Sequence, residues 1–336
     1  MKKVRLIIVI GLVLTMGLVA ACSSNDQGGS GVDETTYVLK VGYVQNEQDF
    51  LTQGLYQMAE RVKERTDGRL IIEVYHSSQL GDTGDVMEQA KAGADVGALT
   101  DAGRLAQYVP QMGILDAPYL FDTYEEGLKI VTSDLWKGWE EELAAKSGFR
   151  VLSFNWYQGA RHFLTNKPVR TPDDLRGLRI RTTGSPVWQA TVEAMGASPT
   201  ALAWGEVYSG LQQGVIDGAE AQHPGTYGMR LYENIDYITK TGHFQLVTGL
   251  VVGENWFQTL PEEFQQILYE ESYEAGKWAS YKVIENLDKL EELMEAEGVT
   301  IDEIDLTPFK EAADVVYDQF PGFRELQAEF NAVLGR

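Results

Sequence analysis

The pattern that most constrains the fold is a strand, a helix and a second strand in close succession near the start of the chain. Residues 37–43 (YVLKVGY) alternate apolar and polar side chains as a half-buried strand does. An apolar stripe at helical spacing runs from about Phe50 to Thr66, and residues 69–75 (RLIIEVY) are again strand-like. This succession indicates a βαβ unit, and therefore an α/β fold with a largely parallel sheet covered by helices.

A third strand brings polar side chains to one edge of the predicted sheet. After a helical pattern over residues 84–92, residues 95–100 (DVGALT) form a short buried strand that leads into Asp101. Ligands of open α/β sheets bind outside the carboxyl ends of the strands. We therefore expect Phe50, Thr100 and Asp101 to form one wall of a cleft. For Asp101, the N-cap of a following short helix is an equally good interpretation.

The length of 336 residues and the hydrophobic content of 44% favour two domains. We expect the chain to cross into a second domain near an irregular stretch at 155–159, and to return with the strand-like run 245–252. These crossings predict a first lobe of residues 35–157 plus 247–286 and a second lobe of residues 158–246 plus 287–336.

Three long helical patterns follow from the same reading of apolar periodicity. They cover residues 124–146, 261–297 and 308–334. The second pattern exceeds 35 residues, so a single helix there is long enough to lie against both lobes.

The chain lacks the sequence motifs of common catalytic sites. It has no glycine loop of the Walker type, no G-x-S-x-G motif, and no H-E-x-x-H motif or cysteine pair. Its four histidines are scattered, and a lone histidine is more often a structural residue than a ligand-binding one. The net charge of −22 argues against a nucleic-acid partner. We expect a binding protein rather than an enzyme, with no cofactor, and nothing indicates a cation that bridges the ligand.

Two arginines and a tryptophan provide the strongest binding chemistry. Arg161 and Arg181 come near the ends of successive predicted strands, and a guanidinium matches a carboxylate as a planar, bidentate donor. Trp204 would offer a flat apolar wall. Together they predict a closed cleft that selects organic anions. The alternative is structural: Arg161 would pair with an internal carboxylate such as Glu220, and Trp204 would fill a core.

The start of the chain predicts export and a lipid anchor. A basic beginning precedes an apolar run over residues 6–20, which is short for a membrane-spanning helix. The run ends in Val-Ala-Ala-Cys, which resembles a bacterial lipobox, and Cys22 is the only cysteine. We expect removal of a signal peptide at 1–21, lipidation of Cys22 and a flexible tether over 22–34. The protein would then sit on the outer face of the cytoplasmic membrane.

Three segments of the sequence resemble one protein family. They are SSQLGDTGDVMEQAKAG at 77–93, GARHFLTNKPVRTPDDLRGLRIRT at 159–182 and MGASPTALAWGEVYSGLQQGVIDGAE at 195–220. They look like the solute-binding subunits of tripartite ATP-independent periplasmic (TRAP) transporters, the dicarboxylate-binding-protein family. The similarity extends from about Val38 to the last helix. It implies a two-lobed clamshell, mostly parallel sheets flanked by helices, and a long helix that bridges both lobes.

The resemblance also implies roles for single residues. Arg181 matches the arginine that holds the ligand carboxylate, Arg161 matches a second arginine of many members, and Trp204 matches an aromatic residue against the ligand. The facing lobe would contribute Phe50, Thr100 and Asp101.

One position departs from the family pattern. Many members have an asparagine directly after the glutamate that Glu220 matches, whereas here Ala221, Gln222 and His223 follow. The amide contact is therefore lost or moved to Gln222. We expect Gln222 and Asp101 to contact hydroxyl, amino or keto groups of the ligand.

The function that the resemblance implies is transport. The protein would capture a small organic acid and deliver it to the small and large membrane subunits of a permease driven by an ion gradient. It would act as a monomer and touch the membrane only through its lipid anchor. Two other classes stay open at this point: a sensor lipoprotein that presents a bound acid to a receptor, and a secreted enzyme.

Overall fold

The computed structural model describes residues 35–336. The predicted signal peptide, the lipidation site Cys22 and the tether lie outside the described residues, so they stay predictions. Residues Thr35–Arg336 form one compact unit. No helix within residues 35–336 combines the length and the apolar character that crossing a bilayer requires.

The described residues build one nine-stranded sheet with the order β2-β1-β3-β8-β4-β7-β5-β6, in which β9 also pairs with β8. The strands are β1 (Tyr37–Gly42), β2 (Leu70–Tyr75), β3 (Val96–Asp101), β4 (Phe149–Thr165), β5 (Arg179–Thr182), β6 (Ser198–Ala201), β7 (Gly218–Gln222), β8 (Tyr237–Gly253) and β9 (Thr300–Asp302). The outer strands β2-β1-β3 and β7-β5-β6 are parallel within each group, as the βαβ pattern predicted. The central pairs β3–β8, β4–β8 and β4–β7 are antiparallel.

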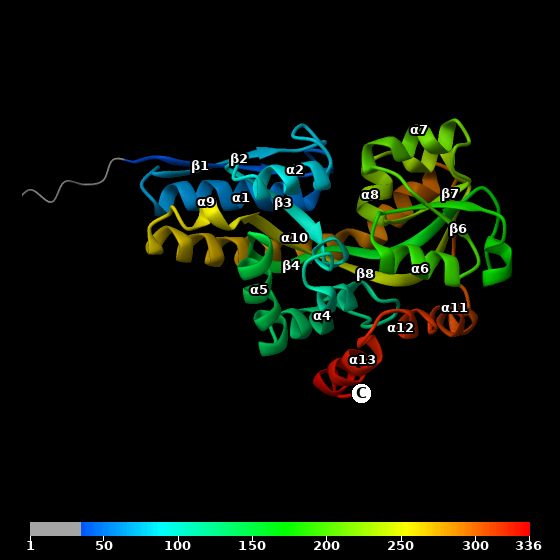
Figure 1. The fold of residues 1–336 in the computed structure, drawn as a ribbon. Helices are drawn as coiled ribbons and strands as arrows, with labels where there is room; N and C mark the ends of the chain where they lie inside the picture. The colour runs from blue at the N-terminus through cyan, green and yellow to red at the C-terminus, as the bar shows by residue number, and fades with distance from the viewer. Residues whose placement is uncertain (1–34) are drawn as a thin grey trace, which may run out of the picture. The chain divides into compact units, whose positions relative to one another are not determined.

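Helices cover both groups of strands (Figure 1). The α-helices are α1 (Phe50–Arg65), α2 (Thr83–Lys91), α3 (Ala102–Leu105), α4 (Tyr124–Val131), α5 (Asp134–Ser147), α6 (Pro186–Ala194), α7 (Val207–Gln212), α8 (His223–Gly228), α9 (Glu254–Phe257), α10 (Glu262–Ala296), α11 (Thr307–Ala313), α12 (Val316–Gln319) and α13 (Phe323–Leu334). Short 3-10 helices are η1 (Pro110–Asp116), η2 (Pro172–Leu175), η3 (Trp204–Glu206) and η4 (Leu231–Asn234). Helices α1 and α2 pack on β2 and β3, whereas α6 and α8 pack on β5 and β7.

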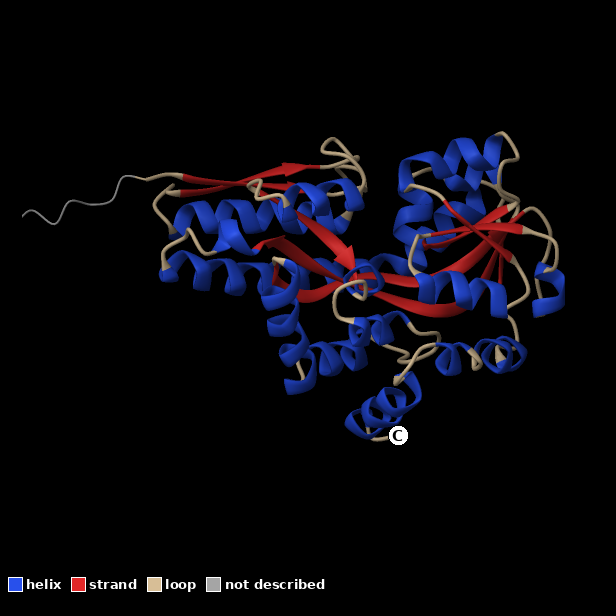
Figure 2. Cartoon of the chain, in the orientation of Figure 1, coloured by secondary structure: helices blue, strands red, loops and turns tan. Residues whose placement is uncertain are grey.

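The fold is two-lobed, and two long strands run through both lobes (Figure 2). Strand β8 pairs with β3 in the first lobe and with β9 in the second, and β4 follows it from end to end. The prediction of an irregular stretch at 155–159 between separate strands was wrong, because β4 continues through it with several register shifts. Gly159 sits at one shift with a φ of 110°, a conformation that glycine adopts at no steric cost. The exact residue boundaries of the lobes stay a prediction.

Helix α10 contains 35 residues and packs on α1, β4 and α8, so the single long helix predicted over 261–297 is confirmed. Its side chains bind β4 directly: the Ser272 and Ser153 hydroxyl oxygens lie 2.7 Å apart, and the Tyr157 N–H donates to Ser280 Oγ at 2.9 Å. The helix is therefore tied to the strand that connects the lobes.

The other two long helices predicted from the sequence are each interrupted. The pattern at 124–146 is divided into α4 and α5, because Ser133 caps α5 by accepting a hydrogen bond from the Trp136 N–H at 3.2 Å. The pattern at 308–334 is divided into α11, α12 and α13. Before α13 the chain turns at Pro321 and Gly322, and Gly322 has a φ of 82°. In both places a local stop signal outweighs a continuous apolar stripe.

Candidate functional site

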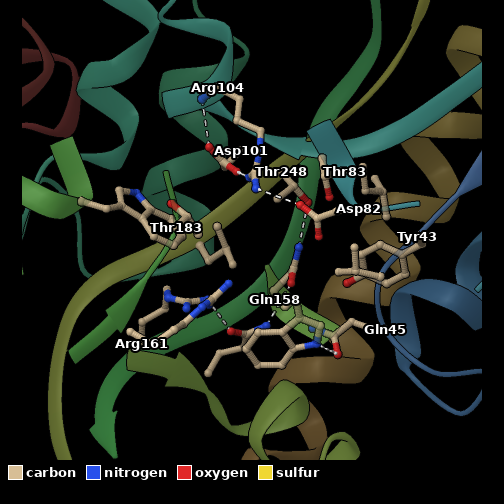
Figure 3. Close-up of a pocket in the computed structure, with 17 residues that line it drawn as sticks. Tyr43, Gln45, Asp82, Thr83, Asp101, Arg104, Gln158, Arg161, Thr183 and Thr248 are labelled. Carbon is tan, nitrogen blue, oxygen red and sulfur yellow. Dashed lines mark hydrogen bonds and ion pairs between the residues drawn. The ribbon is translucent and has the colours of Figure 1, made fainter. Parts of the chain in front are cut away.

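A cavity lies where strand ends of the first lobe face the second lobe (Figure 3). The first lobe contributes Tyr43, Val44, Gln45, Asp82, Thr83, Leu99, Asp101 and Arg104 to its wall. Strands β4 and β8 and the second lobe contribute Gln158, Arg161, Arg181, Thr183, Trp188, Trp204, Gln222, Leu246 and Thr248. A concave wall that combines a few polar groups with aromatic side chains is typical of small-molecule sites.

Arg181 is a buried cation in this wall. It lies on β5, where Ile180 points into the core and Arg181 points the other way; the side chain is 3% exposed. Its Nε and Nη2 donate to the Leu202 carbonyl at 3.0 and 2.8 Å, and the guanidinium carbon lies 5.2 Å from the centre of the Trp204 ring. Burial lowers the pKa of Arg181 to about 10, so the group is still charged at neutral pH. No carboxylate of the described chain forms an ion pair with it.

Arg161, in contrast, has a full set of internal partners. Its Nε donates to the Glu220 carboxylate, its Nη2 to the Glu220 carbonyl at 2.6 Å, and its Nη1 to Gln222 Oε1 at 2.6 Å. Glu220 is completely buried and also accepts from the Thr182 hydroxyl at 2.9 Å. The structural alternative for Arg161, a pair with Glu220, is therefore confirmed, although Arg161 also lines the cavity.

Trp204 and Gln222 connect parts of the wall. Trp204 Nε1 donates to Gln45 Oε1 at 3.1 Å, which joins the second lobe to the first. The Trp204 ring lines the cavity and also belongs to a core cluster, so its contact with a ligand stays a prediction. Gln222, the last residue of β7, donates from Nε2 to Gln158 Oε1 at 3.0 Å. The side-chain oxygen Oε1 of Gln222 accepts from Arg161 Nη1, and this bond fixes the orientation of the amide.

Asp101 is both the N-cap of α3 and a residue of the cavity wall. Its carboxylate caps α3 by accepting from the Arg104 N–H at 2.9 Å, and it lines the cavity. It forms an ion pair with the Arg104 guanidinium, and Asp82 lies 3.8 Å from the same group. The cavity therefore has an acidic edge in which one arginine faces two carboxylates.

Thr100 and Phe50 do not lie in this wall. Successive side chains of a strand point to opposite faces, so Leu99 and Asp101 face the cavity while the Thr100 hydroxyl contacts Met87 Sδ at 3.2 Å. Phe50 begins α1 and lines a neighbouring cavity instead. The same alternation over residues 95–101 places the side chains of Thr100 and Asp101 on opposite faces of the strand, so only one of them can face the cavity.

Several wall residues were missed by the sequence analysis. Tyr43 and Gln45 follow β1, so the same rule about carboxyl ends of strands would have found them. Gln158 carried no such signal, because it lies in the middle of β4 beside the bulge at Gly159. Arg104 lines the cavity beside Asp101, with which it forms an ion pair.

The histidines within residues 35–336 lie outside the cavity wall. The rings of His162 and His223 pack 4.7 Å apart, and His243 Nε2 lies 4.0 Å from Glu220 Oε2. Burial, with a smaller contribution from the nearby Arg161 charge, lowers the pKa of His243 to about 3, so this ring is neutral. His243 therefore lies beside the Arg161–Glu220 pair without adding a charge to it.

Comparison with known proteins gives one consistent family. The sequence profile of the bacterial extracellular solute-binding proteins, family 7, matches residues 41–322. A solute-binding protein of Chromohalobacter salexigens is 32% identical over 269 residues, which cover 79% of each chain. The C4-dicarboxylate-binding periplasmic protein of Vibrio cholerae is 30% identical over 85% of this chain and 86% of its own.

Solved structures agree with the sequence comparison. A TRAP periplasmic solute-binding protein from Ochrobacterium anthropi with bound L-fuconate superposes with a TM-score of 0.85 at 36% identity, covering 88% of this chain and all of that one. An unliganded, open TRAP solute-binding protein from Escherichia fergusonii is 40% identical over 89% of this chain and all of its own, with a TM-score of 0.78.

Proposed function

This chain belongs to family 7 of the bacterial extracellular solute-binding proteins, and we propose that it captures a small organic acid for a TRAP transporter. The family consists of extracytoplasmic transport proteins rather than enzymes. Relatives of known ligand support an acid as the solute, since one binds C4-dicarboxylates and another holds L-fuconate. The wall of the cavity is consistent with such a ligand.

The main support for the proposal is that Arg181 is buried without an ionic partner among the described residues. Removing a charge from water costs several kcal/mol, and buried charges are therefore normally paired. Arg181 is buried, yet its hydrogen bonds go only to the Leu202 carbonyl, and Nη1 donates to no partner among residues 35–336. A ligand carboxylate would supply the missing counter-charge and accept from Nη1.

The other wall residues would orient the solute. Trp204 would pack against the carbon skeleton while its Nε1 holds the two lobes together through Gln45. Gln222 and Asp101 would contact polar groups of the ligand. Arg161 would act mainly by holding Gln222, because its charge is already balanced by Glu220.

The remaining proposals concern place and partners. A lipid on Cys22 would retain the protein at the outer face of the cytoplasmic membrane, and the tether at 22–34 would let it reach the permease. The protein would act as a monomer. Closure would move residues 35–157 plus 247–286 against 158–246 plus 287–336, and the closed form would bind the small and large membrane subunits.

A binding screen tests the proposal. We expect the purified protein to gain thermal stability with at least one organic acid among C4-dicarboxylates, keto acids, sugar acids and acidic amino acids, and calorimetry to confirm one site per chain. Failure of every acid would refute the proposal. Uptake of the identified acid by cells, lost on deletion of this protein, distinguishes transport from a sensor, for which uptake would continue.

A further inference from the structure

The charges around the cavity indicate which kind of organic acid the site binds. Resting on the proposed function, we infer that the site binds an acid with a single carboxylate and a hydroxylated remainder, and that it discriminates against dicarboxylates. The inference depends on two observations: the distribution of charge over the wall, and a buried hydroxyl group that has no partner.

The wall contains three arginines, but only one is available to an anion. Arg161 is neutralised by Glu220, and Arg104 is held by Asp101 with Asp82 nearby. Arg181 alone has no carboxylate partner among the described residues. One free cation matches one carboxylate.

The edge of the cavity formed by Asp82, Asp101 and Arg104 is acidic. In Figure 3, Asp101 and Arg104 lie at the top of the view with Asp82 on the same side of the cavity, and Arg161 lies at the bottom. Asp82 and Asp101 together carry two negative charges against the single positive charge of Arg104. A second ligand carboxylate at this edge would meet an uncompensated carboxylate. Two like charges about 7 Å apart at an effective dielectric constant near 20 repel enough to weaken binding by about 50-fold.

Neutral polar groups occupy the space between these ends. Tyr43 is 3% exposed and its hydroxyl has no hydrogen-bond partner within residues 35–336, although the side chain lines the cavity. A buried hydroxyl without a partner costs free energy, which a hydrogen-bonding ligand would recover. Gln45, Gln158 and Thr248 line the same space. Their side-chain oxygens already have partners in the protein, whereas the amide nitrogens of Gln45 and Gln158 keep N–H groups that can donate to a ligand. Such a surface is suited to ligand hydroxyl groups.

Matched pairs of sugar acids test the inference directly. An aldonate and the corresponding aldarate share their internal hydroxyl groups, and differ only in whether the far carbon is an alcohol or a carboxylate. We expect D-gluconate, D-galactonate or D-mannonate to bind by calorimetry, and its aldarate partner to bind at least about 30-fold more weakly. The neutral alditol should not bind.

The variant Asp82→Asn locates the cause of the discrimination. Asparagine is also a favourable N-cap, so α2 should be preserved. We expect the aldonate-to-aldarate ratio to fall at least about fivefold, because one repelling charge is removed. Asp95→Asn is the matched control: it removes the same charge from an exposed residue just before β3, about 20 Å from the Asp101 end. It should leave the ratio unchanged.

Tyr43→Phe tests the hydroxyl contact independently. It should weaken aldonate binding by about 3- to 10-fold, because one hydrogen bond to the ligand is lost. The same change should raise the melting temperature of the unliganded protein, since a buried hydroxyl without a partner disappears. Unchanged aldonate affinity would contradict the role of Tyr43.

The outcomes separate this inference from the proposed function. Equal or tighter binding of an aldarate or of succinate would overturn the inference, because a second cation such as Arg104 would then be binding the second carboxylate. The proposed function as an acid-binding subunit would stand in that case. Binding of no carboxylate at all would overturn both. Binding of the aldonate alone, with a smaller ratio in Asp82→Asn only, is the result that we expect.

Discussion

Replacing Arg181 with methionine should weaken ligand binding by at least about 30-fold while leaving the unliganded protein nearly as stable as before. Methionine keeps much of the length and the contact with the Trp204 ring but removes the charge. Truncating one partner of a buried, hydrogen-bonded charge pair costs about 2–5 kcal/mol of binding free energy, which corresponds to a loss of about 30- to 4,000-fold in affinity. The unliganded protein loses two hydrogen bonds to the Leu202 carbonyl but also loses an unpaired buried charge, and the two effects oppose each other.

Arg161→Met is the matched control, because the residue type, the burial and the cavity are the same. Here the change leaves the Glu220 carboxylate, which is 0% exposed, without its cation. Breaking a buried ion pair on one side costs about 3–5 kcal/mol of folding stability. At about 2 °C per kcal/mol for a chain of this size, the melting temperature should fall by about 6–10 °C.

Calorimetry with the identified acid and differential scanning calorimetry without it measure the two effects. We expect opposite results for the two variants: Arg181→Met loses affinity and keeps its melting temperature within about 3 °C, whereas Arg161→Met mainly loses stability. If Arg181→Met bound the acid with unchanged affinity, or if it unfolded as readily as Arg161→Met, the assignment of Arg181 as the free cation would be refuted.

Trp204→Phe keeps an aromatic wall but removes the hydrogen bond to Gln45, so ligand affinity measured by calorimetry should fall by about 3- to 10-fold; an unchanged affinity would show that this bond does not contribute to binding. Ligand affinity should be constant at neutral pH and fall as the pH rises through about 10, where Arg181 loses its proton; a curve that is flat up to pH 11 would contradict the anchor. Burial raises the pKa of Glu140 to about 8, above its value in the unfolded chain, so its ionisation lowers stability as the pH rises from about 4.5 to 8. Glu140→Gln, which can still accept from Trp136 Nε1, should therefore melt several degrees higher than the parent at pH 8.5 and at the same temperature at pH 4, and equal melting at both pH values would exclude this effect.

The sequence was sufficient for the parts of the site that follow from strand geometry. Asp101, Arg181 and Gln222 are each at the carboxyl end of a strand, and the structure brings all three to one cavity. The long helix α10 was equally predictable, since no stop signal interrupts its pattern before the glycine at 298. In these cases local sequence and tertiary structure agree.

The rest depends on contacts between residues that are distant in the sequence. Arg161 and Arg181 look alike in the sequence, and only the pairing of β4 with β7 places Glu220 beside Arg161 and leaves Arg181 free. The continuity of β4 was hidden because its bulges break the alternation of side chains around Gly159. Charge balance in a site is a property of the fold, and no single segment encodes it.

The continuous strands β4 and β8 also have a mechanical consequence. The lobes are joined by a hydrogen-bonded ribbon with α10 fastened along it, rather than by flexible linkers. Any opening must bend this ribbon, most readily near the register shift at Tyr157 and Gly159 where the ladder is interrupted. The connection is therefore an elastic hinge. It restricts the direction in which the lobes can move, and the energy needed to bend it contributes to the free energy of closure. Affinity for the solute would therefore depend on residues of the ribbon that never touch it.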